Sequence, residues 1–295
     1  MLEGTNRGLP AVLGLAVLTT ALGVLLGAWM PAPDARISSG PPRVISLTPS
    51  ITDTLFAIGA GRRVVGVSDY CEPPPWARAV ARVGSGITPN FERMARLEPS
   101  LVVGEPGSAM RSELGALGET HWLPWFTLED VARGTRELGR LTGHEAQANA
   151  LARQLEERLG GPPPRDAPRV LVVLGTGFGH SDQWWFARRG CLHDRVLGAA
   201  GGVNAVPDEL YGPPNLSLEQ LVRIDPDVVM LLCEEDPVWA ESMLATLRTA
   251  IRGKVVLIAG KDVLSTGPKI LELVDRMRRE LGRPKQGQSS RSYRR

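Results

Sequence analysis

Two stretches of the chain carry the same pattern of residues. NFERMARLEPSLVV, at residues 90–103, is matched by SLEQLVRIDPDVVM, at residues 217–230, with glutamate, arginine, proline and valine in register. Each copy predicts a capped short helix followed by a buried strand. A chain that repeats such a unit is expected to form two similar α/β lobes, and a ligand commonly binds in the cleft between such lobes.

The ends of the repeated helices are marked in both copies. Asn90 and Ser217 are residues that favour the N-cap position, and Ser217 with Gln220 fits a capping box. Pro99 and Pro226 are expected to end the helices, because a proline removes a backbone hydrogen bond and clashes with the preceding turn.

The composition is that of an ordinary globular protein. A length of 295 residues predicts one or two domains, and a hydrophobic share of 43% is enough for genuine cores. The formal net charge of +2 gives no argument for nucleic-acid binding.

Predicted strands alternate with predicted helices through the body of the chain, which favours mostly parallel sheets. Residues 43–126 form the first predicted lobe and residues 161–283 the second. Between them, segment 127–160 has leucines at helical spacing, so we expect one long helix that joins the lobes. A break near Gly143 is the alternative, because the residues around it resemble a helix end and a restart.

The amino-terminal segment, residues 1–42, differs from the body. Residues 9–30 carry no charge and consist mostly of Leu, Ala, Val and Gly. That length fits either a cleaved secretory signal or a membrane anchor, and both interpretations export the body. A buried helix of the body is disfavoured by the proline-rich linker that follows. At the other end, residues 284–295 are basic and polar and predict a disordered tail.

The cysteines and histidines give no clear chemical site. Cys71, Cys191 and Cys233 lack CxxC spacing, so either one disulfide or three free buried thiols is possible in an exported protein. The four histidines do not cluster at metal-ligand spacing, and no metal site is predicted.

A loop rich in glycine and aromatic residues is predicted after the first strand of the second lobe. Trp184, Trp185 and Phe186 are consecutive, so they cannot all face one core, and an exposed member would offer broad apolar contact. The glycines before them do not match the nucleotide-binding pattern, and no catalytic motif is present. An enzyme is therefore the weaker class of function.

Several segments together resemble the substrate-binding proteins of ABC importers for cobalamin and iron chelates. They are RVISLTPSITDTLFAIGAGRRVVGVSDYCEPP, the two repeat copies and AAGGVNAV. The resemblance covers residues 43–283 and is strongest for the cobalamin branch. It implies a class III α/β fold, in which two Rossmann-like lobes with mostly parallel sheets are bridged by one long α-helix. The ligand would lie between the lobes, and their motions would be small.

The resemblance also implies ligand-binding residues. Tyr70 stands where the cobalamin proteins place a tyrosine that packs on the corrin ring, although it could instead cover the edge of the core. The family's tryptophan four residues before the first repeat copy is replaced here by Gly86. We expect Phe178, Trp184 or Trp185 to supply the aromatic contact with the ligand that this tryptophan would otherwise make.

Two glutamates match the family's docking residues. Glu92 and Glu219 correspond to surface glutamates that pair with arginines of the permease. Each stands two residues after an N-cap, where the helix dipole stabilises a carboxylate, so capping alone is the alternative. The same charge at the same place in both lobes favours docking on a twofold partner.

The expected function is that of an exported receptor, either free in the periplasm or tethered to the outer face of the inner membrane. It would bind a corrinoid, need no cofactor of its own, and deliver the ligand to the permease subunits of an ABC importer. A ferric siderophore or heme receptor is the alternative within the class. A membrane-tethered enzyme acting on a small substrate is the alternative outside it.

Overall fold

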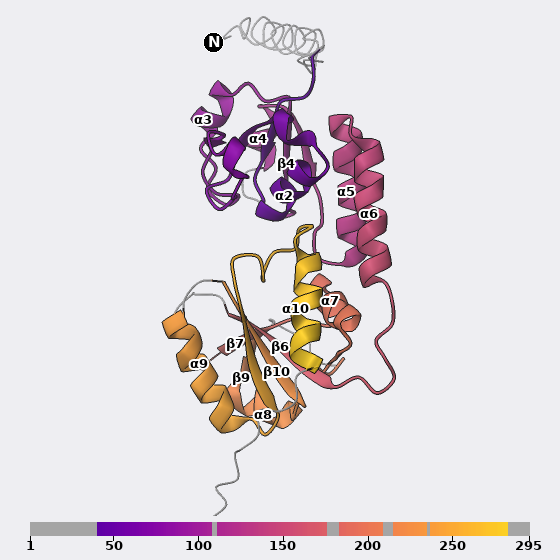
Figure 1. The fold of residues 1–295 in the computed structure, drawn as a ribbon. Helices are drawn as coiled ribbons and strands as arrows, with labels where there is room; N and C mark the ends of the chain where they lie inside the picture. Colours follow the sequence, from indigo (N-terminus) through magenta and orange to yellow (C-terminus); the bar gives the residue numbers. More distant parts are fainter. Residues whose placement is uncertain (1–39, 108–110, 176–182, 209–214, 235–236, 283–295) are drawn as a thin grey trace, which may run out of the picture. The chain divides into compact units, whose positions relative to one another are not determined.

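Two β-sheets form the framework of the computed structural model, which describes residues 40–107, 111–175, 183–208, 215–234 and 237–282 (Figure 1). In the first sheet all paired strands are parallel, in the order β3-β2-β1-β4-β5. Its strands are β1 (Val44–Ser46), β2 (Val64–Val67), β3 (Ala81–Arg82), β4 (Leu101–Gly104) and β5 (Glu119–Trp122).

Helices cover both faces of the first sheet because its central strands are apolar on both sides. Val44 and Val103 share a core cluster with Ile51, whereas Val102 faces the opposite cluster with Met94. The elements between the strands are α2 (Pro49–Ala57), η1 (Ala60–Arg63), η2 (Pro75–Ala77), α3 (Phe91–Arg96) and α4 (Arg111–Gly115).

The second sheet is mixed. Its order is β11-β10-β6-β7-β9, with β8 also paired to β6. Strands β6, β8, β10 and β11 are parallel, and β7 runs antiparallel to both of its neighbours. The strands are β6 (Arg169–Gly175), β7 (Gln183–Phe186), β8 (Val203–Asn204), β9 (Asn215–Ser217), β10 (Val228–Cys233) and β11 (Lys254–Ala259).

Four helices belong to the second sheet. Alternate residues of β6 again point to different cores: Val172 packs in the cluster that contains Val196 and Val274, and Val173 in the cluster that contains Leu221. The helices are α7 (Leu192–Ala200), α8 (Leu218–Ile224), α9 (Pro237–Ala250) and α10 (Ile270–Gly282). The predicted α/β class with mostly parallel sheets is therefore confirmed.

Each sheet has an arginine at the start of its central strand that ties the repeated helix to the sheet. The Arg43 guanidinium donates to the Leu97 carbonyl at 2.7 Å, and its backbone N–H donates to Ser100 Oγ at 3.0 Å. In the second sheet, the Arg169 guanidinium donates to the carbonyls of Ile224 and Asp225, both at 3.1 Å.

The backbone around these carbonyls is also repeated. Glu98, two residues after the end of α3, and Asp225, directly after α8, are the non-glycine residues with positive φ in the described chain, at 44° and 47°. This left-handed turn aims the last carbonyls of each helix away from its axis, where the arginine can reach them. The repeat seen in the sequence is thus a repeat of three-dimensional structure.

The predicted helix caps are confirmed. Asn90 Oδ1 accepts a hydrogen bond from the Arg93 N–H at 2.9 Å at the start of α3. Ser217 and Gln220 form the predicted capping box at the start of α8, with distances of 3.2 and 2.8 Å. Pro99 and Pro226 lie between each helix and its strand, as expected.

The prediction of a single bridging helix is wrong, and the alternative, a break near Gly143, is confirmed. Segment 127–160 forms two helices, α5 (Leu128–Thr142) and α6 (Glu145–Leu159), which pack side by side (Figure 1). Gly143 ends α5 with a φ of 74°, a left-handed value that suits glycine. Arg136 of α5 and Glu156 of α6 form a bidentate ion pair at 2.9 and 2.7 Å. Because these residues lie on either side of the short turn, α6 must run back along α5, and the two helices are antiparallel.

The α5–α6 hairpin packs against helices that belong to both sheets. On one side α5 packs on α2 and η1, and on the other α6 packs on α7. Leu138 of α5 and Leu155 of α6 belong to the core cluster that also contains residues of α2 and α10. The described residues from Gly40 onward accordingly form one compact unit, and the lobe boundaries at 126 and 161 stay a prediction.

Two terminal predictions lie outside the described residues. They are the apolar segment 9–30 and the tail at 284–295. Among the helices that the structure does describe, none has the length and apolar character needed to cross a bilayer.

Close packing inside the hairpin gives the first prediction. A Cβ added at Gly139 would lie 2.3 Å from Cβ of Ala148, whereas one added at Gly198 of α7 has no neighbour within 4 Å. Gly139→Ala should lower the free energy of unfolding by about 1 kcal/mol or more, because overpacking outweighs the gain in helix propensity.

Gly198→Ala is the matched control, and it should raise the free energy of unfolding by about 0.5–1 kcal/mol. Urea denaturation measures both changes. Equal stabilisation by the two substitutions would contradict the hairpin packing and favour a straight helix.

Candidate functional site

The loop that follows β2 presents Tyr70 to solvent. The Asp69 N–H donates to the Gly84 carbonyl at 2.9 Å, and the Cys71 N–H donates to the Ser68 carbonyl at 3.1 Å. Between these two anchored residues the Tyr70 side chain is 74% exposed. It does not cover the edge of the core. A large aromatic held in this way at the carboxyl end of a parallel strand stands where ligands of such sheets bind.

Cys71 anchors the same loop on its buried side. Its thiol is buried and lies 3.1 Å from Thr52 Oγ1 and 3.2 Å from Ser68 Oγ. Burial raises the pKa of the Cys71 thiol, so it stays protonated and unreactive at neutral pH. Cys191 and Cys233 are also buried, and none of the three cysteines forms a disulfide.

A second exposed apolar residue lies on the neighbouring turn. Ile87 is 73% exposed, in a tight turn where Ser85 Oγ accepts the N–H groups of Ile87 and Thr88 at 3.2 and 2.8 Å. The turn adjoins the Tyr70 loop through the bond from Asp69 to Gly84. Sequence analysis missed Ile87, although serine and threonine on either side of Gly86 are a turn signal. Ile87 provides apolar surface next to the position where the family tryptophan is absent.

The aromatic run of the second lobe is a strand and not a loop. Its residues alternate, as in any strand: Trp184 is 8% exposed, Trp185 43% and Phe186 2%. Trp185 is therefore the member of the run with surface available to a ligand. Trp184 packs in a core cluster, and its burial argues against the ligand contact predicted for it. Phe178 lies outside the described residues.

The segment after β11 connects the two sheets' carboxyl ends. Thr266 Oγ1 lies 2.7 Å from Ser50 Oγ at the start of α2, and the Thr266 carbonyl accepts from Trp125 Nε1 at 3.0 Å. Lys261 Nζ lies 3.5 Å from the Glu72 carboxylate, two residues beyond Tyr70. Because Glu72 follows β2 and Lys261 follows β11, the carboxyl ends of the two sheets face each other.

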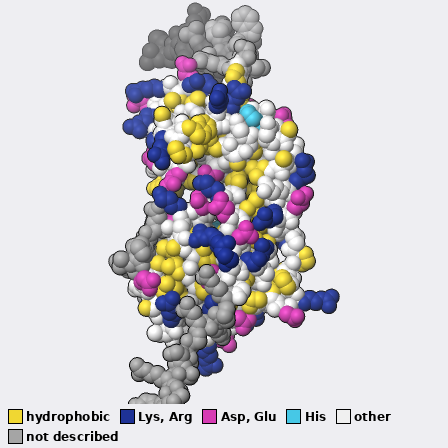
Figure 2. All heavy atoms as spheres, viewed as in Figure 1, with side chains coloured by type: hydrophobic (Ala, Val, Ile, Leu, Met, Phe, Trp, Pro, Cys, Tyr) yellow, Lys and Arg dark blue, Asp and Glu magenta, His cyan; other side chains and the backbone are white. Residues whose placement is uncertain are grey.

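Charged side chains reinforce this contact. Lys269 Nζ lies 3.0 Å from Asp262 in its own segment and 3.6 Å from Asp53 of α2. Burial raises the pKa of Asp53, and the positive charge of Lys269 opposes the rise. Figure 2 shows acidic and basic side chains interspersed in the middle of one face of the molecule, without a large area of one sign.

His193 holds the same segment from the second lobe. Its ring lies on α7, is buried, and has Nε2 3.1 Å from the Val263 carbonyl. Burial lowers the pKa of His193, so the neutral ring is the stable form in the folded protein. Donation from Nε2 to the carbonyl then fixes the segment that carries Thr266.

Glu92 and Glu219 occupy equivalent places. Both are the second residue of a capped helix, with side chains 76% and 81% exposed. Each accepts from the arginine four residues later, Arg96 at 2.5 Å and Arg223 at 2.9 Å. Such exposed pairs contribute only about 0.3–0.5 kcal/mol, so both carboxylates can exchange partners readily.

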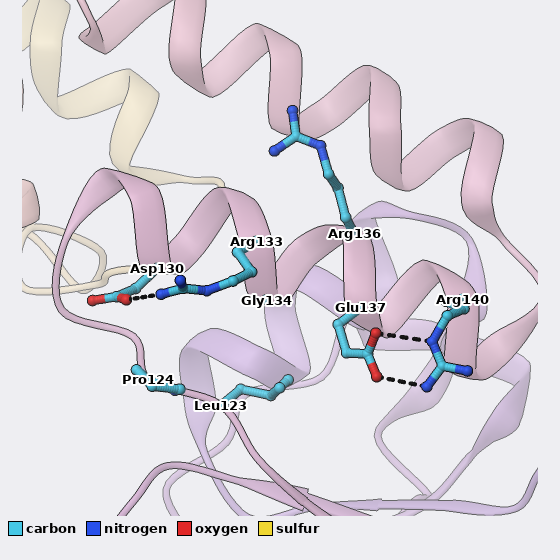
Figure 3. A pocket seen from close by; sticks show the side chains of 8 residues that line it. All are labelled: Leu123, Pro124, Asp130, Arg133, Gly134, Arg136, Glu137 and Arg140. Atoms are coloured by element: carbon cyan, nitrogen blue, oxygen red, sulfur yellow. Dashed lines mark hydrogen bonds and ion pairs between the residues drawn. The ribbon is translucent and has the colours of Figure 1, made fainter.

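A cavity of about 540 Å³ lies beside α5, away from these residues (Figure 3). Leu123 and Pro124 line it together with charged side chains of α5. Those charges are already matched, because Arg133 pairs with Asp130, Arg140 with Glu137 and Arg136 with Glu156 on α6. The cavity therefore offers no unpaired group for a polar ligand. In the described part of the chain no cluster of His, Cys, Asp and Glu could hold a metal ion.

Comparison with known proteins decides the family. Residues 44–259 match the periplasmic binding protein family. The chain belongs to this family. A vitamin B12-binding protein of Salmonella typhimurium is 30% identical over 194 residues, which are 64% of this chain and 72% of the relative. Members of the family are transport components that work in the periplasm.

Solved structures show the same fold. The periplasmic vitamin B12-binding protein of Vibrio cholerae is similar with a TM-score of 0.64 and 23% identity, over 82% of this chain and 96% of that one. The periplasmic heme-binding protein of the same organism gives a TM-score of 0.68 at 19% identity, over 82% and 99%. The periplasmic binding protein fold is therefore common to receptors for different ligands.

The buried histidine predicts a pH dependence. The pKa of His193 lies below its usual value of about 6.5 in the folded protein, so below pH 6.5 the unfolded chain binds more protons. The free energy of unfolding should fall as the pH is lowered from 7 through 6.5 towards 5. In His193→Gln, which retains a donor for the Val263 carbonyl, this fall should be smaller. Urea denaturation at several pH values measures the slope, and equal slopes in the two proteins would contradict the assignment.

Proposed function

We propose that this periplasmic binding protein captures a corrinoid and delivers it to the permease of an ABC importer. The observation that carries the proposal is Tyr70, an exposed aromatic ring on an anchored loop at the carboxyl end of β2. A flat tetrapyrrole-like ring offers a wide apolar face, and an aromatic side chain stacks on such a face with little loss of conformational entropy. Ile87 and Trp185 add apolar surface at the same ends of the sheets.

Sequence similarity supports the choice of a corrinoid. The Salmonella typhimurium relative, at 30% identity, is a vitamin B12-binding protein. The Vibrio cholerae structures carry no such weight, because at 23% and 19% identity they support the fold alone.

A receptor for heme or a ferric siderophore is the second candidate. The Tyr70 hydroxyl is exposed, and a tyrosine oxygen is a known ligand of ferric heme iron. The two candidates use different parts of the same side chain: a corrinoid needs the ring, and ferric iron needs the hydroxyl oxygen.

Glu92 and Glu219 are proposed to dock on the permease. Their carboxylates are exposed, lie at equivalent places in the repeat, and are held only by weak surface ion pairs. Two equivalent carboxylates suit a partner that presents two equivalent basic sites. Charge pairs of this kind set the register and the encounter rate more than the affinity.

Residues 9–30 are proposed to bring the body to the outer side of the inner membrane. The uncharged length of the segment supports either a cleaved signal or a tether. Amino-terminal sequencing of the protein purified from cells, together with its distribution between membrane and periplasmic fractions, distinguishes the two. A full-length protein found in the cytoplasm would contradict both.

Substitution of Tyr70 tests the ligand. Tyr70→Ala should weaken cyanocobalamin binding by about 1–3 kcal/mol, because a stacked ring is lost, and Tyr70→Phe should bind nearly as well as the native protein. Isothermal titration of cyanocobalamin and of hemin measures both ligands. Trp76→Ala is the control, since Trp76 is also exposed but packs on Phe56 with a centroid distance of 5.4 Å. Strong hemin binding that Tyr70→Phe abolishes, without cyanocobalamin binding, would replace the first candidate by the second.

Charge reversal tests docking. Glu92→Arg with Glu219→Arg should leave cyanocobalamin affinity unchanged and reduce uptake in a reconstituted importer by ten-fold or more, on the order expected for repulsive charges at an interface. Glu129→Arg with Glu272→Arg is the control, because both residues likewise lie in the first turn of a helix but outside the repeat. Normal uptake by the Glu92/Glu219 variant would show that these residues only stabilise their helices.

A further inference from the structure

We infer that Arg82 is a positioning residue for Tyr70, and that the receptor's affinity for its ligand depends on this arginine without direct contact. The inference rests on the proposed function, since it assumes that Tyr70 contacts the ligand. Arg82 ends β3, the edge strand next to β2, and its side chain reaches the loop that follows β2.

A single nitrogen of Arg82 donates hydrogen bonds to three backbone carbonyls of that loop. Nη1 donates to Ser68 at 2.9 Å, to Asp69 at 3.3 Å, and to Cys71. These are the carbonyls on both sides of Tyr70. Converging carbonyl dipoles repel one another unless a positive charge lies between them, so the guanidinium makes this tight loop favourable.

The other contacts of the loop are weaker than those of Arg82. They are the backbone bonds from Ser68 to Ser46, from Asp69 to Gly84 and from Cys71 to Ser68, the contacts of the buried Cys71 thiol, and an exposed ion pair between Glu72 and Lys261. None of these contacts involves the Tyr70 side chain, which is largely surrounded by solvent. The direction of the ring is therefore set by the backbone of the loop, and Arg82 is the charged side chain that bonds directly to the carbonyls of this backbone.

Fixing the loop matters for binding because an immobile side chain has less conformational entropy to lose. A mobile loop would have to be ordered when the ligand binds, and the affinity would fall accordingly. Arg82 would therefore preorganise the loop for binding. Without Arg82, the Tyr70 side chain would still be present, but its loop would be free to move.

The experiment combines amide exchange with a double-mutant cycle. Arg82→Met keeps the aliphatic stem and removes the charge. Hydrogen exchange at the amides of Asp69 and Cys71 should become at least several-fold faster, and cyanocobalamin Kd should rise on the order of ten-fold, as expected for the loss of charged hydrogen bonds. In the Tyr70→Ala background the same substitution should change Kd by less than about two-fold, because the two residues act as one unit.

Arg43→Met is the matched control. Arg43 also donates to loop carbonyls in the same lobe, but at the opposite end of the sheet. It should lower stability without changing either the exchange at Asp69 and Cys71 or the Kd. Arg82→Lys should restore only part of the affinity, since the lysine side chain is shorter and its ammonium group is more strongly hydrated than a guanidinium.

The outcomes separate the inference from the proposed function. Unchanged exchange at Asp69 and Cys71 in Arg82→Met, or an equal rise in Kd in both Tyr70 backgrounds, would overturn the positioning role. If Tyr70→Ala by itself leaves cyanocobalamin and hemin binding unchanged, the proposed ligand site is wrong, whatever the exchange rates show.

Discussion

An arginine at the start of the central strand fixes the geometry of each sheet. Arg43 and Arg169 draw the final carbonyls of the repeated helix onto the strand, and a left-handed residue, Glu98 or Asp225, turns those carbonyls towards the guanidinium. Helix, turn and strand are thereby held as one unit in both halves of the chain. The places of Glu92 and Glu219 follow, because each begins the helix whose end the arginine holds.

The opposite ends of the sheets have different chemistry. There the Tyr70 loop and the segment after β11 approach each other through Lys261 and Glu72, while Thr266 joins α2 and Trp125. These contacts are polar and one of them is a hydroxyl pair, so they give direction more than large stability. Apolar packing through the α5–α6 hairpin supplies a continuous core behind them. The two halves of the chain therefore share an apolar core as well as these polar contacts.

Comparison with other periplasmic binding proteins limits what the fold can say about the ligand. Receptors for vitamin B12 and for heme have similar structures, with TM-scores of 0.64 and 0.68 to this chain. The ligand is chosen by a few side chains on otherwise similar loops. In this chain Gly86 stands where the resemblance implies a tryptophan, and the exposed Ile87 beside it offers a smaller apolar side chain next to the Tyr70 loop.

The sequence by itself determined those features that depend on a few neighbouring residues. The caps at Asn90 and Ser217, the stops at Pro99 and Pro226, and the two α/β halves were predictable because capping, proline geometry and apolar patterning act locally. Tertiary structure alone decided the rest. Helix α6 packs closely on α5, where Gly139 lies against Ala148, and Trp184 is buried because β7 is a strand between β6 and β9 with one face in a core cluster. Those contacts join residues that a local pattern cannot relate, since their energies exist only once distant segments meet.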